Sequence, residues 1–578
     1  LSALQWLPAL AHLPETVRAE GLGEWSMVWS YHPFLSLLLL LPDYLNLTVK
    51  GVSLHQYWGE PLYAMMPFFI NGYLGLFPFL LLGAGLKLFY QIPQRVYLGF
   101  FGLLTLLLLM MAWGKYFPLY TFLLGLPGMG FFRYPSKLLV FVSLGLCLAT
   151  GFVFQAFLET PAFLRHLWQW SLGLGLLLLG GLLALHAQVA ANLSHLRGQL
   201  LAAALLALGI SCWSYFWGKR PAIQAWGLGL LLAGIGLDLL LNGLAALPLA
   251  PSAALFETAS KPAQYLLKQR LAQNSQARML LSAAPRVVVP PTFAPQWQDR
   301  PELRFNTFHH ASLQNNFNLA WGFRNAYGET AALGHKGQVM NRLYLEALAL
   351  NKAPFKQVYE SLLAVRYVLV LTPDAKTTEY YSRSGHYLQR QTYPELQLTL
   401  YENKEALPRA RFQYQSMAIK DPKVIPALLA EPQSQSGIDF RSRVLLNDDQ
   451  ALKQAKAQVP AREAREKRWQ GPHFKVDKNN HLALELETNT SGYVVLADQH
   501  LPGWRAWDNG QETPILTANF FMRAVRVGPG KHQIVMRYEP PGFVVGLWIS
   551  LLSGLIWVGL LLGGNFFQKR PPRPALQA

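Results

Sequence analysis

Long apolar stretches at both ends of the chain enclose a polar region of nearly 300 residues. The apolar stretches that are long enough for membrane helices lie at about 67–86, 95–113, 136–158, 168–190, 198–217, 222–242 and 543–563. A further apolar stretch, residues 25–47, is interrupted by Pro33 and Pro42, which favours a shallow helix at the membrane surface. The pattern predicts a polytopic helical membrane protein whose last helix follows a large polar insertion.

Basic residues fall on alternate connections between the predicted helices. They are Lys87, Arg95, Arg165, Lys219, Arg220, Lys569, Arg570 and Arg573. Because lysine and arginine are retained on the cytoplasmic side, this alternation predicts that residues 251–540 are extracytoplasmic.

The first half of the polar region reads as mixed α/β. Short apolar runs at 287–289 and 367–370 predict buried strands, and residues 343–350 predict a helix. These signals lie within residues 251–405 and have no repeat.

The second half reads as strands. The turn signals Asp508-Asn-Gly510 and Gly528-Pro-Gly530 predict two hairpins, the second of which would pair 521–527 with 532–538. A charged, Ala-rich stretch near 449–468 is helix-like. Four regions are therefore expected: membrane helices with their loops over 1–250, a mixed α/β region over 251–405, a β-sandwich-like region over 406–540, and a final membrane helix with a basic tail over 541–578.

Composition agrees with membrane helices that carry a polar domain, since 52% of the 578 residues are hydrophobic and 14% are charged. The net charge of +18 comes without a nucleic-acid-binding motif, so membrane lipid is expected as the anionic partner and nucleic acid is not. Cys147 and Cys212 lie in apolar runs and are interpreted as small core residues. The chain begins at Leu1 within an apolar phrase, which indicates a missing N-terminal portion.

A Gly-rich turn with two cations, Pro127-Gly-Met-Gly-Phe-Phe-Arg-Tyr-Pro-Ser-Lys137, precedes the third predicted helix. Arg133 and Lys137 would stand at the membrane surface, where they could bind the phosphate of a lipid. The alternative is that both side chains snorkel to the interface and only anchor the helix. The residues alone leave both interpretations open.

Other polar residues give weaker signals. Asp238 near the end of a predicted span is either functional or, with Asn242, part of a helix cap. His309 and His310 have no acidic or cysteine partner at metal-binding spacing, so no metal site is expected. Asp498 and His500 precede a Pro-Gly-Trp turn, and a turn-stabilising role for Asp498 is preferred over an acid–base pair.

Several short sequence motifs occur in a characteristic order along the chain. They are Gln5-Trp-Leu-Pro8 with Glu15 and Arg18, Tyr57-Trp-Gly59, Phe132-Arg-Tyr-Pro-Ser-Lys137, Asp238-Leu-Leu, Val365-Arg-Tyr-Val368, Tyr401-Glu-Asn403, Leu407-Pro-Arg409, Leu501-Pro-Gly-Trp-Arg505 and Gly528-Pro-Gly-Lys-His532. From one end to the other, the chain resembles the bacterial YfhO family of membrane proteins.

The resemblance implies a GT-C glycosyltransferase in the bacterial cytoplasmic (inner) membrane. Such an enzyme transfers a sugar from a polyprenyl-phosphate carrier to a cell-envelope glycopolymer acceptor on the outer face. Its acidic catalytic loop would lie upstream of this chain, so the catalytic residue is unknown and Glu60 is the best candidate within it. A divalent cation is compatible with this chemistry, although no motif supports one.

The resemblance also assigns roles to residues. Arg133 and Lys137 would bind the lipid phosphate, and the expected substrate-binding residues are Arg18, His55, Tyr57, Trp58 and Asp238. The alternative function is a non-enzymatic envelope scaffold or lipid-carrier-binding membrane protein. The polar domain would either hold the acceptor or act as a structural lid.

Overall fold

A computed structural model of the chain forms two compact units. The helical unit comprises Gly21–Ala250 and Ala294–Arg304, and the sheet unit comprises Leu1–Glu20, Pro251–Phe293 and Phe305–Ala578. The structure describes residues 2–16, 26–28, 30–41, 73–126, 134–159, 162–188, 194–217, 229, 232–240, 259–269, 271, 276–282, 308, 310–313, 319, 321–326, 339–340, 353–371, 375–421, 424–430, 438–447 and 470–567.

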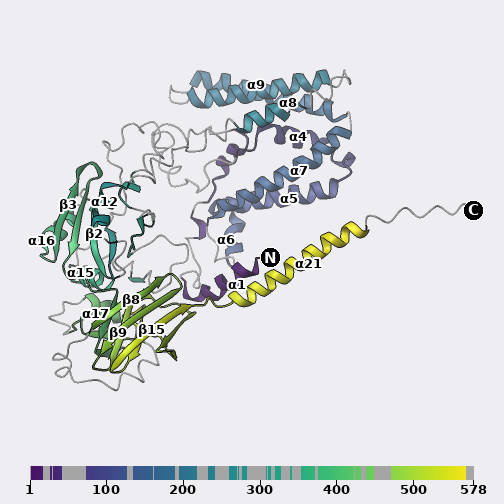
Figure 1. Cartoon of the computed structure of the whole chain (residues 1–578). Helices are drawn as coiled ribbons and strands as arrows, with labels where there is room; N and C mark the ends of the chain where they lie inside the picture. Colours follow the sequence, from purple (N-terminus) through teal and green to yellow (C-terminus); the bar gives the residue numbers. More distant parts are fainter. Residues whose placement is uncertain are drawn as a thin grey trace, which may run out of the picture. The chain divides into compact units, whose positions relative to one another are not determined.

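The helical unit packs long apolar helices side by side, and α8 lies along α9 (Figure 1). Its elements are η3 Pro33–Leu39, α4 Leu76–Lys87, η4 Phe89–Gln91, α5 Arg95–Ala112, η5 Gly114–Tyr116, α6 Pro118–Leu124, η7 Pro135–Leu138, α7 Leu139–Glu159, α8 Ala162–Gln188 and α9 Ser194–Trp217. Residues 232–240 are also helical.

Four helices in the described part of the chain are long and apolar enough to cross a membrane. They are Arg95–Ala112, Pro135–Leu158, Gly198–Phe216 and Phe543–Leu562. Many of their large apolar side chains are exposed, which is stable only where lipid replaces water as the solvent. The chain is therefore a membrane protein.

The described part of 25–47 contains a helix, the 3₁₀-helix η3, and its place at the membrane surface stays a prediction. One expectation for the apolar stretches needs correction. Cys147 and Cys212 are unpaired and exposed on α7 and α9 rather than buried in a core. An apolar run that faces lipid looks in sequence like one that faces a core, so composition could not separate the two.

The first part of the sheet unit is a four-stranded mixed sheet in the order β1-β2-β4-β3, in which β1 and β2 are parallel. Its elements are α12 Lys261–Lys268, β1 Arg278–Ser282, α15 Ala353–Leu362, β2 Val365–Leu371, α16 Ala375–Arg383, β3 Tyr387–Tyr393, η13 Pro394–Leu396 and β4 Leu398–Asn403. The apolar run 367–370 lies within β2, as predicted, and every residue of β2 except Arg366 is buried. The expected elements at 287–289 and 343–350 lie outside the described residues.

The rest of the polar region is two stacked sheets. The six-stranded sheet has the order β5-β10-β14-β13-β7-β6, and the five-stranded sheet has the order β12-β11-β15-β9-β8. Val494, Leu496 and Val525 of the first sheet share one apolar core with Leu484 and Ile534 of the second. The region is a β-sandwich in which alternate residues of each strand face inward.

The sandwich elements are β5 Ala410–Gln413, β6 Gln415–Ala418, α17 Ile425–Ala430, β7 Arg443–Leu446, β8 Gln470–Lys478, β9 His481–Thr488, β10 Gly492–Gln499, β11 Trp504–Asp508, β12 Gln511–Thr513, β13 Leu516–Ala518, β14 Met522–Val527 and β15 Gly530–Tyr538. The helix-like stretch 449–468 lies outside the described residues.

The two predicted hairpins have different outcomes. Asn509 and Gly510 both have positive φ, and the strands on either side of them pair, so the first hairpin is confirmed. The second prediction is wrong. β14 pairs with β10 and β13, whereas β15 pairs with β9 and β11, so Gly528-Pro-Gly530 carries the chain from one sheet to the other. Both strands alternate in the way a hairpin would because both face the shared core.

Buried ion pairs join the mixed sheet to both sheets of the sandwich. The Asp498 carboxylate on β10 accepts hydrogen bonds from Arg278 of β1, from Arg523 of β14 at 3.0 Å and from Arg409 at 2.7 Å. Arg409 also binds Asp477 of β8 at 2.9 Å. We call this set, together with Arg324, which also binds Asp477, the ion cluster.

The ion cluster overturns the expected role of Asp498 as a turn-stabilising residue. Burial by itself would raise the pKa of Asp498, but Arg409, Arg278 and Arg523 hold that pKa well below its usual range. His500 instead hydrogen bonds through Nδ1 to Thr517 Oγ1 at 2.9 Å. Asp498 is therefore an ionised structural residue, because its three arginine partners outweigh the effect of burial.

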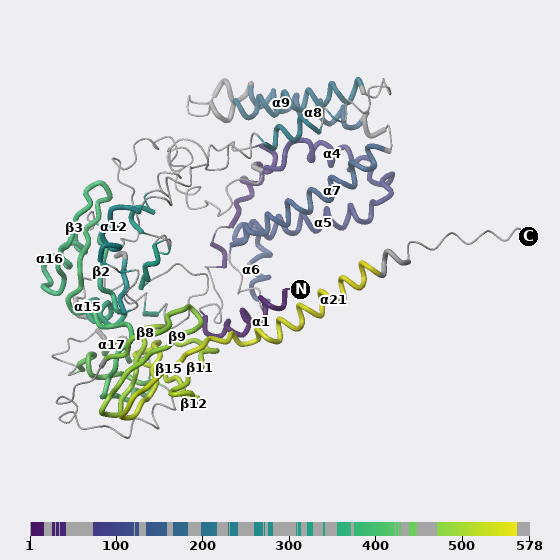
Figure 2. Tube along the Cα trace, viewed as in Figure 1, coloured from purple at the N-terminus to yellow at the C-terminus, as the bar shows by residue number. Residues whose placement is uncertain are grey.

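The sheet unit includes one close helix pair, formed by α1 Ala3–His12 and α21 Phe543–Phe567 (Figure 2). The backbone N–H of Leu4 donates to Ser550 Oγ at 2.9 Å. A Cβ added to Gly546 would lie 2.5 Å from the carbonyl oxygen of Ala3. Gly542, Gly546 and Ser550, spaced four apart, are small residues of the kind that let membrane helices approach closely. The 3₁₀ turn η1 Leu13–Glu15 follows α1.

The ion cluster predicts a strong and pH-dependent loss of stability in Asp498→Asn. Removing one partner of a buried ion pair costs about 3–5 kcal/mol. Because the folded pKa is below the unfolded value of about 3.9, the Asp498 contribution is fully present from pH 8 to pH 5 and declines below about pH 4. Thermal unfolding of the purified chain at several pH values measures this difference.

Glu512→Gln is the matched control for Asp498→Asn, because Glu512 pairs with Arg505 in an exposed position where water screens the charges. An equal loss of stability in the two variants would contradict the structural role of the ion cluster.

The helix pair predicts that Gly546→Leu separates α1 from α21. Cysteines introduced at Leu4 and Ser550, in a chain whose own two cysteines are replaced by serine, should form a disulfide in high yield. Gly546→Leu should lower that yield several-fold, since its side chain would overlap the backbone of α1. Gly559→Leu on the same helix has no atom within 4 Å of the added Cβ and should leave the yield unchanged.

Candidate functional site

Most of the site residues expected from the sequence lie outside the described residues. They are Arg18, His55, Tyr57, Trp58, Glu60 and Arg133. Lys137 and Asp238 are described, and both belong to the helical unit. The site is therefore built from the segments around these two residues.

Gly114, just after α5, brings three segments into contact. Its φ is +52°, a conformation that favours glycine, and an added Cβ would lie 2.2 Å from Ser30 Oγ and 2.8 Å from Pro135 Cγ. Ser30 Oγ accepts from the backbone N–H of Lys115 at 3.0 Å. The end of α5, the start of η7 and the segment around Ser30 are consequently packed against one another.

Residues 30–41 run as a strap from this junction along the helices. The strap begins where the N–H of Tyr31 donates to the carbonyl of Ala112 at 2.9 Å. Trp113 Nε1 donates to Ser36 Oγ at 3.0 Å. At the other end of the strap, the N–H of Leu74 donates to the carbonyl of Leu39 at 3.2 Å. The strap therefore connects the end of α5 with the start of α4.

The junction carries a group of cations and rings that we call the cationic lip, consisting of His32, Lys115, Tyr116, Tyr134 and Lys137. Lys115 Nζ lies 5.1 Å from the centre of the Tyr116 ring, and Lys137 Nζ lies 4.9 Å from that of Tyr134. His32 packs edge-on against Tyr116 with ring centres 4.6 Å apart. Burial and the neighbouring Lys115 lower the pKa of His32, which keeps this imidazole neutral.

The backbone before η7 is strained in a way that fixes Lys137. Tyr134 has φ 69° and ψ 73°, which is uncommon for a residue with a side chain. The N–H of Lys137 donates to the carbonyl of Tyr134 at 3.0 Å, closing the turn. Pro135 and Ser136 are buried while Lys137 is exposed, so the turn presents the ammonium group outward.

Within the described residues, Lys115 and Lys137 form no ion pair with a carboxylate. Each ammonium group instead lies over a tyrosine ring, a contact worth about 0.5–1 kcal/mol at exposed sites. Cations that have no carboxylate partner among the residues described can bind the oxygens of a phosphate group.

Asp238 lies at the other end of the strap from the cationic lip. Its Oδ2 accepts from the Tyr73 hydroxyl at 2.7 Å and lies 3.6 Å from a Cβ added to Gly75, just before α4. The seven residues of η3 separate the two places by about 14 Å along the strap. The structure therefore links Asp238 to the lip through one segment but does not bring it into contact with the lip lysines.

The sequence interpretation did not identify His32 and Lys115 as site residues. Lys115 follows the predicted span 95–113 by two residues and was recognisable as a cation at a helix end, whereas His32 reaches the lip only through the fold of the strap. Among the described residues, no three His, Cys, Asp or Glu side chains gather to hold a metal ion. His310 is described and buried, and packs near Trp321.

Gly114→Ala should disturb the lip, because it forces a side chain into a positive-φ position and onto Ser30 and Pro135. A residue with a Cβ in this backbone region costs about 1–2 kcal/mol before any overlap is counted. The expected result is a lower melting temperature and weaker binding of anionic lipid by the purified protein. Gly102→Ala on α5 has no atom within 4 Å of the added Cβ and should have neither effect.

Comparison with known proteins supports the resemblance read from the sequence. Residues 441–550 match the family model described as bacterial membrane protein YfhO. No curated protein and no solved structure matches the chain. The matched residues contain β7 to β15 and the start of α21, which joins the sandwich to an apolar membrane helix. Over these residues the chain is similar to the YfhO family of bacterial membrane proteins.

Proposed function

We propose that this protein is a GT-C type glycosyltransferase that takes a sugar from a polyprenyl-phosphate carrier and transfers it to a cell-envelope acceptor outside the cytoplasmic membrane. The observation that supports this function best is the cationic lip. Lys115 and Lys137 stand at the ends of two apolar helices, in contacting segments, without carboxylate partners among the described residues. A lipid whose phosphate lies at the membrane surface and whose tail lies along apolar helices suits this arrangement.

The lip has a clear chemical role in such a transfer. When the sugar leaves the carrier, negative charge grows on the departing phosphate, and positioned cations stabilise it. Arg133 directly precedes Tyr134, and on this proposal it adds a bidentate guanidinium to the two ammonium groups. The Tyr134 and Tyr116 rings hold the ammonium groups in place before the lipid arrives.

The acceptor hydroxyl needs a base, and two carboxylates are candidates. Glu60 remains the preferred residue from the sequence. Asp238 is the candidate among the described residues, and its hydrogen bond from Tyr73 orients the carboxylate. On this proposal one of these groups accepts the acceptor proton while the lip holds the phosphate.

A second function, binding of the lipid carrier without chemistry, is favoured by one observation. Asp238 is about 14 Å along the strap from the lip, farther than direct proton transfer at a sugar on the lip phosphate allows. In this case the protein would be an envelope scaffold or lipid handler that uses the same lip.

Lys115→Ala and Lys137→Ala should each weaken binding of a polyprenyl phosphate by about tenfold or more, because a charge-assisted hydrogen bond contributes about 1.5–3 kcal/mol. Arg133→Ala should do the same, and Arg133→Lys should recover only part of the affinity. Lys87→Ala, at the exposed end of α4, is the matched control. Unchanged binding in all three alanine variants would show that these cations serve only as membrane anchors.

Transfer of a labelled sugar from the carrier to envelope acceptor, measured with the same preparations, separates the two functions. A glycosyltransferase should lose transfer, but not carrier binding, in Glu60→Gln or in Asp238→Asn. Carrier binding without any acceptor-dependent transfer by the longest form of the protein would favour the scaffold.

A further inference from the structure

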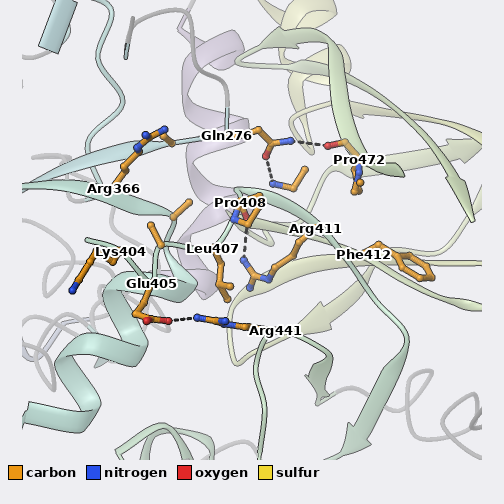
Figure 3. Close-up of a pocket in the computed structure, with 15 residues that line it drawn as sticks. Gln276, Arg366, Lys404, Glu405, Leu407, Pro408, Arg411, Phe412, Arg441 and Pro472 are labelled. Carbon is orange, nitrogen blue, oxygen red and sulfur yellow. Dashed lines mark hydrogen bonds and ion pairs between the residues drawn. The ribbon is translucent and has the colours of Figure 1, made fainter. Parts of the chain in front are cut away.

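A cavity of about 640 Å³ lies in the sheet unit where the mixed sheet meets the sandwich (Figure 3). Its walls come from the residues just before β1, from β2, β5 and β8, and from the connection from Lys404 to Pro408. The side chain of Gln276 holds two of these walls together. Its Nε2 donates to the carbonyl of Pro472 at 2.7 Å and its Oε1 accepts from the N–H of Ala410 at 2.7 Å. The cavity is therefore part of a fixed seam.

The charged groups that line the cavity are mostly positive. The lining holds Arg366, Lys404, Arg411 and Arg441 and one carboxylate, that of Glu405. Glu405 is paired with Arg441, and Arg366 is paired with Glu402 outside the lining at 3.1 Å. Lys404 is exposed and forms no ion pair within the described part of the chain. The remaining walls are largely apolar, with Leu407 and Phe412 among them. A cavity of this size and lining suits a small organic ligand with one negatively charged end.

Arg411 is the unusual member of the lining, because it is a buried cation without a carboxylate partner in the described part of the chain. Its side chain is only 4% exposed. Its guanidinium donates to the carbonyl of Leu362 at 3.1 Å and contacts Met522 Sδ at 3.4 Å, while its Nε has no partner. Burial and the nearby Arg278 lower the pKa of Arg411 to about 9.

The ion cluster beside Arg411 does not neutralise it. Within the described residues, this region contains five guanidinium groups and two carboxylates. The guanidinium groups belong to Arg278, Arg324, Arg409, Arg411 and Arg523, and the carboxylates to Asp477 and Asp498. An excess of buried positive charge is costly, and arginine does not relieve it by losing a proton. A bound anion in the adjoining cavity would offset it.

We infer that this cavity is a binding site for the phosphate or carboxylate group of a small organic ligand, with Arg411 at its base and Lys404 at its rim. The site is separate from the cationic lip and does not depend on whether the chain transfers a sugar. A guanidinium and an ammonium are the groups that recognise such oxyanions by charge-assisted hydrogen bonds. The apolar walls would contact the uncharged part of the ligand.

The test is isothermal titration calorimetry of the purified full chain in detergent with glucose 6-phosphate, glucuronate and glucose. Glucose 6-phosphate or glucuronate should bind and glucose should not, and the tighter of the two anions identifies the preferred group. Binding of glucose as tight as that of both anions, or no heat from either anion at millimolar concentration, would overturn the inference.

Two charge-reversal variants locate the binding. Lys404→Glu should lower the affinity for the anion by at least about tenfold. Lys420→Glu makes the same change at an exposed position outside the cavity and should leave affinity within twofold. An equal loss of anion affinity in both variants would show that the anion is attracted by the overall charge of the protein, and would contradict the proposal.

Arg411→Met removes the buried cation and tests its role independently of Lys404 at the rim. Anion binding should be lost, and the anion should no longer raise the melting temperature as it does in the wild-type chain. If Arg411→Met fails to fold, Lys404→Glu against Lys420→Glu still decides the question. Retained binding in a folded Arg411→Met protein would rule out Arg411 as the base of the site.

Discussion

The sheet unit depends on one electrostatic constraint, the burial of Asp498 among three arginines. Asp498, Arg278 and Arg523 come from β10, β1 and β14, and Arg409 extends the network through Asp477 to β8. A buried ion pair adds little net stability over an apolar pair, but it strongly penalises any arrangement that leaves one member without its partner. The mixed sheet and both sheets of the sandwich are therefore held in one relative arrangement. The seam cavity and its walls follow from that arrangement.

The two units use different cations because their surroundings differ. The cationic lip uses lysines, whose compact ammonium groups remain exposed at helix ends and rest on tyrosine rings. The seam uses arginines, whose planar guanidinium groups can be buried while they donate to several acceptors. The first set remains exposed, whereas the second set is fixed by protein carboxylates except at Arg411.

Much of the fold could be predicted where the signal is local. The apolar spans, the buried run in β2 and the turn at Asn509-Gly510 each rest on a few adjacent residues. The pairing of β14 and β15 could not be predicted, because inward-facing alternation is the same for a hairpin and for two strands in facing sheets. Asp498 was misread for a related reason. Its three partners lie 25 to 220 positions away in the chain, and no local sequence pattern predicts them. Lys137 was identified from its place at a helix start, but His32 and Lys115 join it only through the contacts of Gly114.

The pairing of α1 with α21 imposes an order on biosynthesis. The hydrogen bond from Leu4 to Ser550 spans 546 positions, so α1 cannot find this partner until the residues between them have been made. At about 5–20 residues per second, synthesis of the intervening chain takes on the order of 30 to 110 seconds. During that time the helical unit and the strands β1 to β15 are made. Closure of α1 on Gly546 consequently follows synthesis of all these elements, and a substitution there would leave insertion of the earlier helices intact.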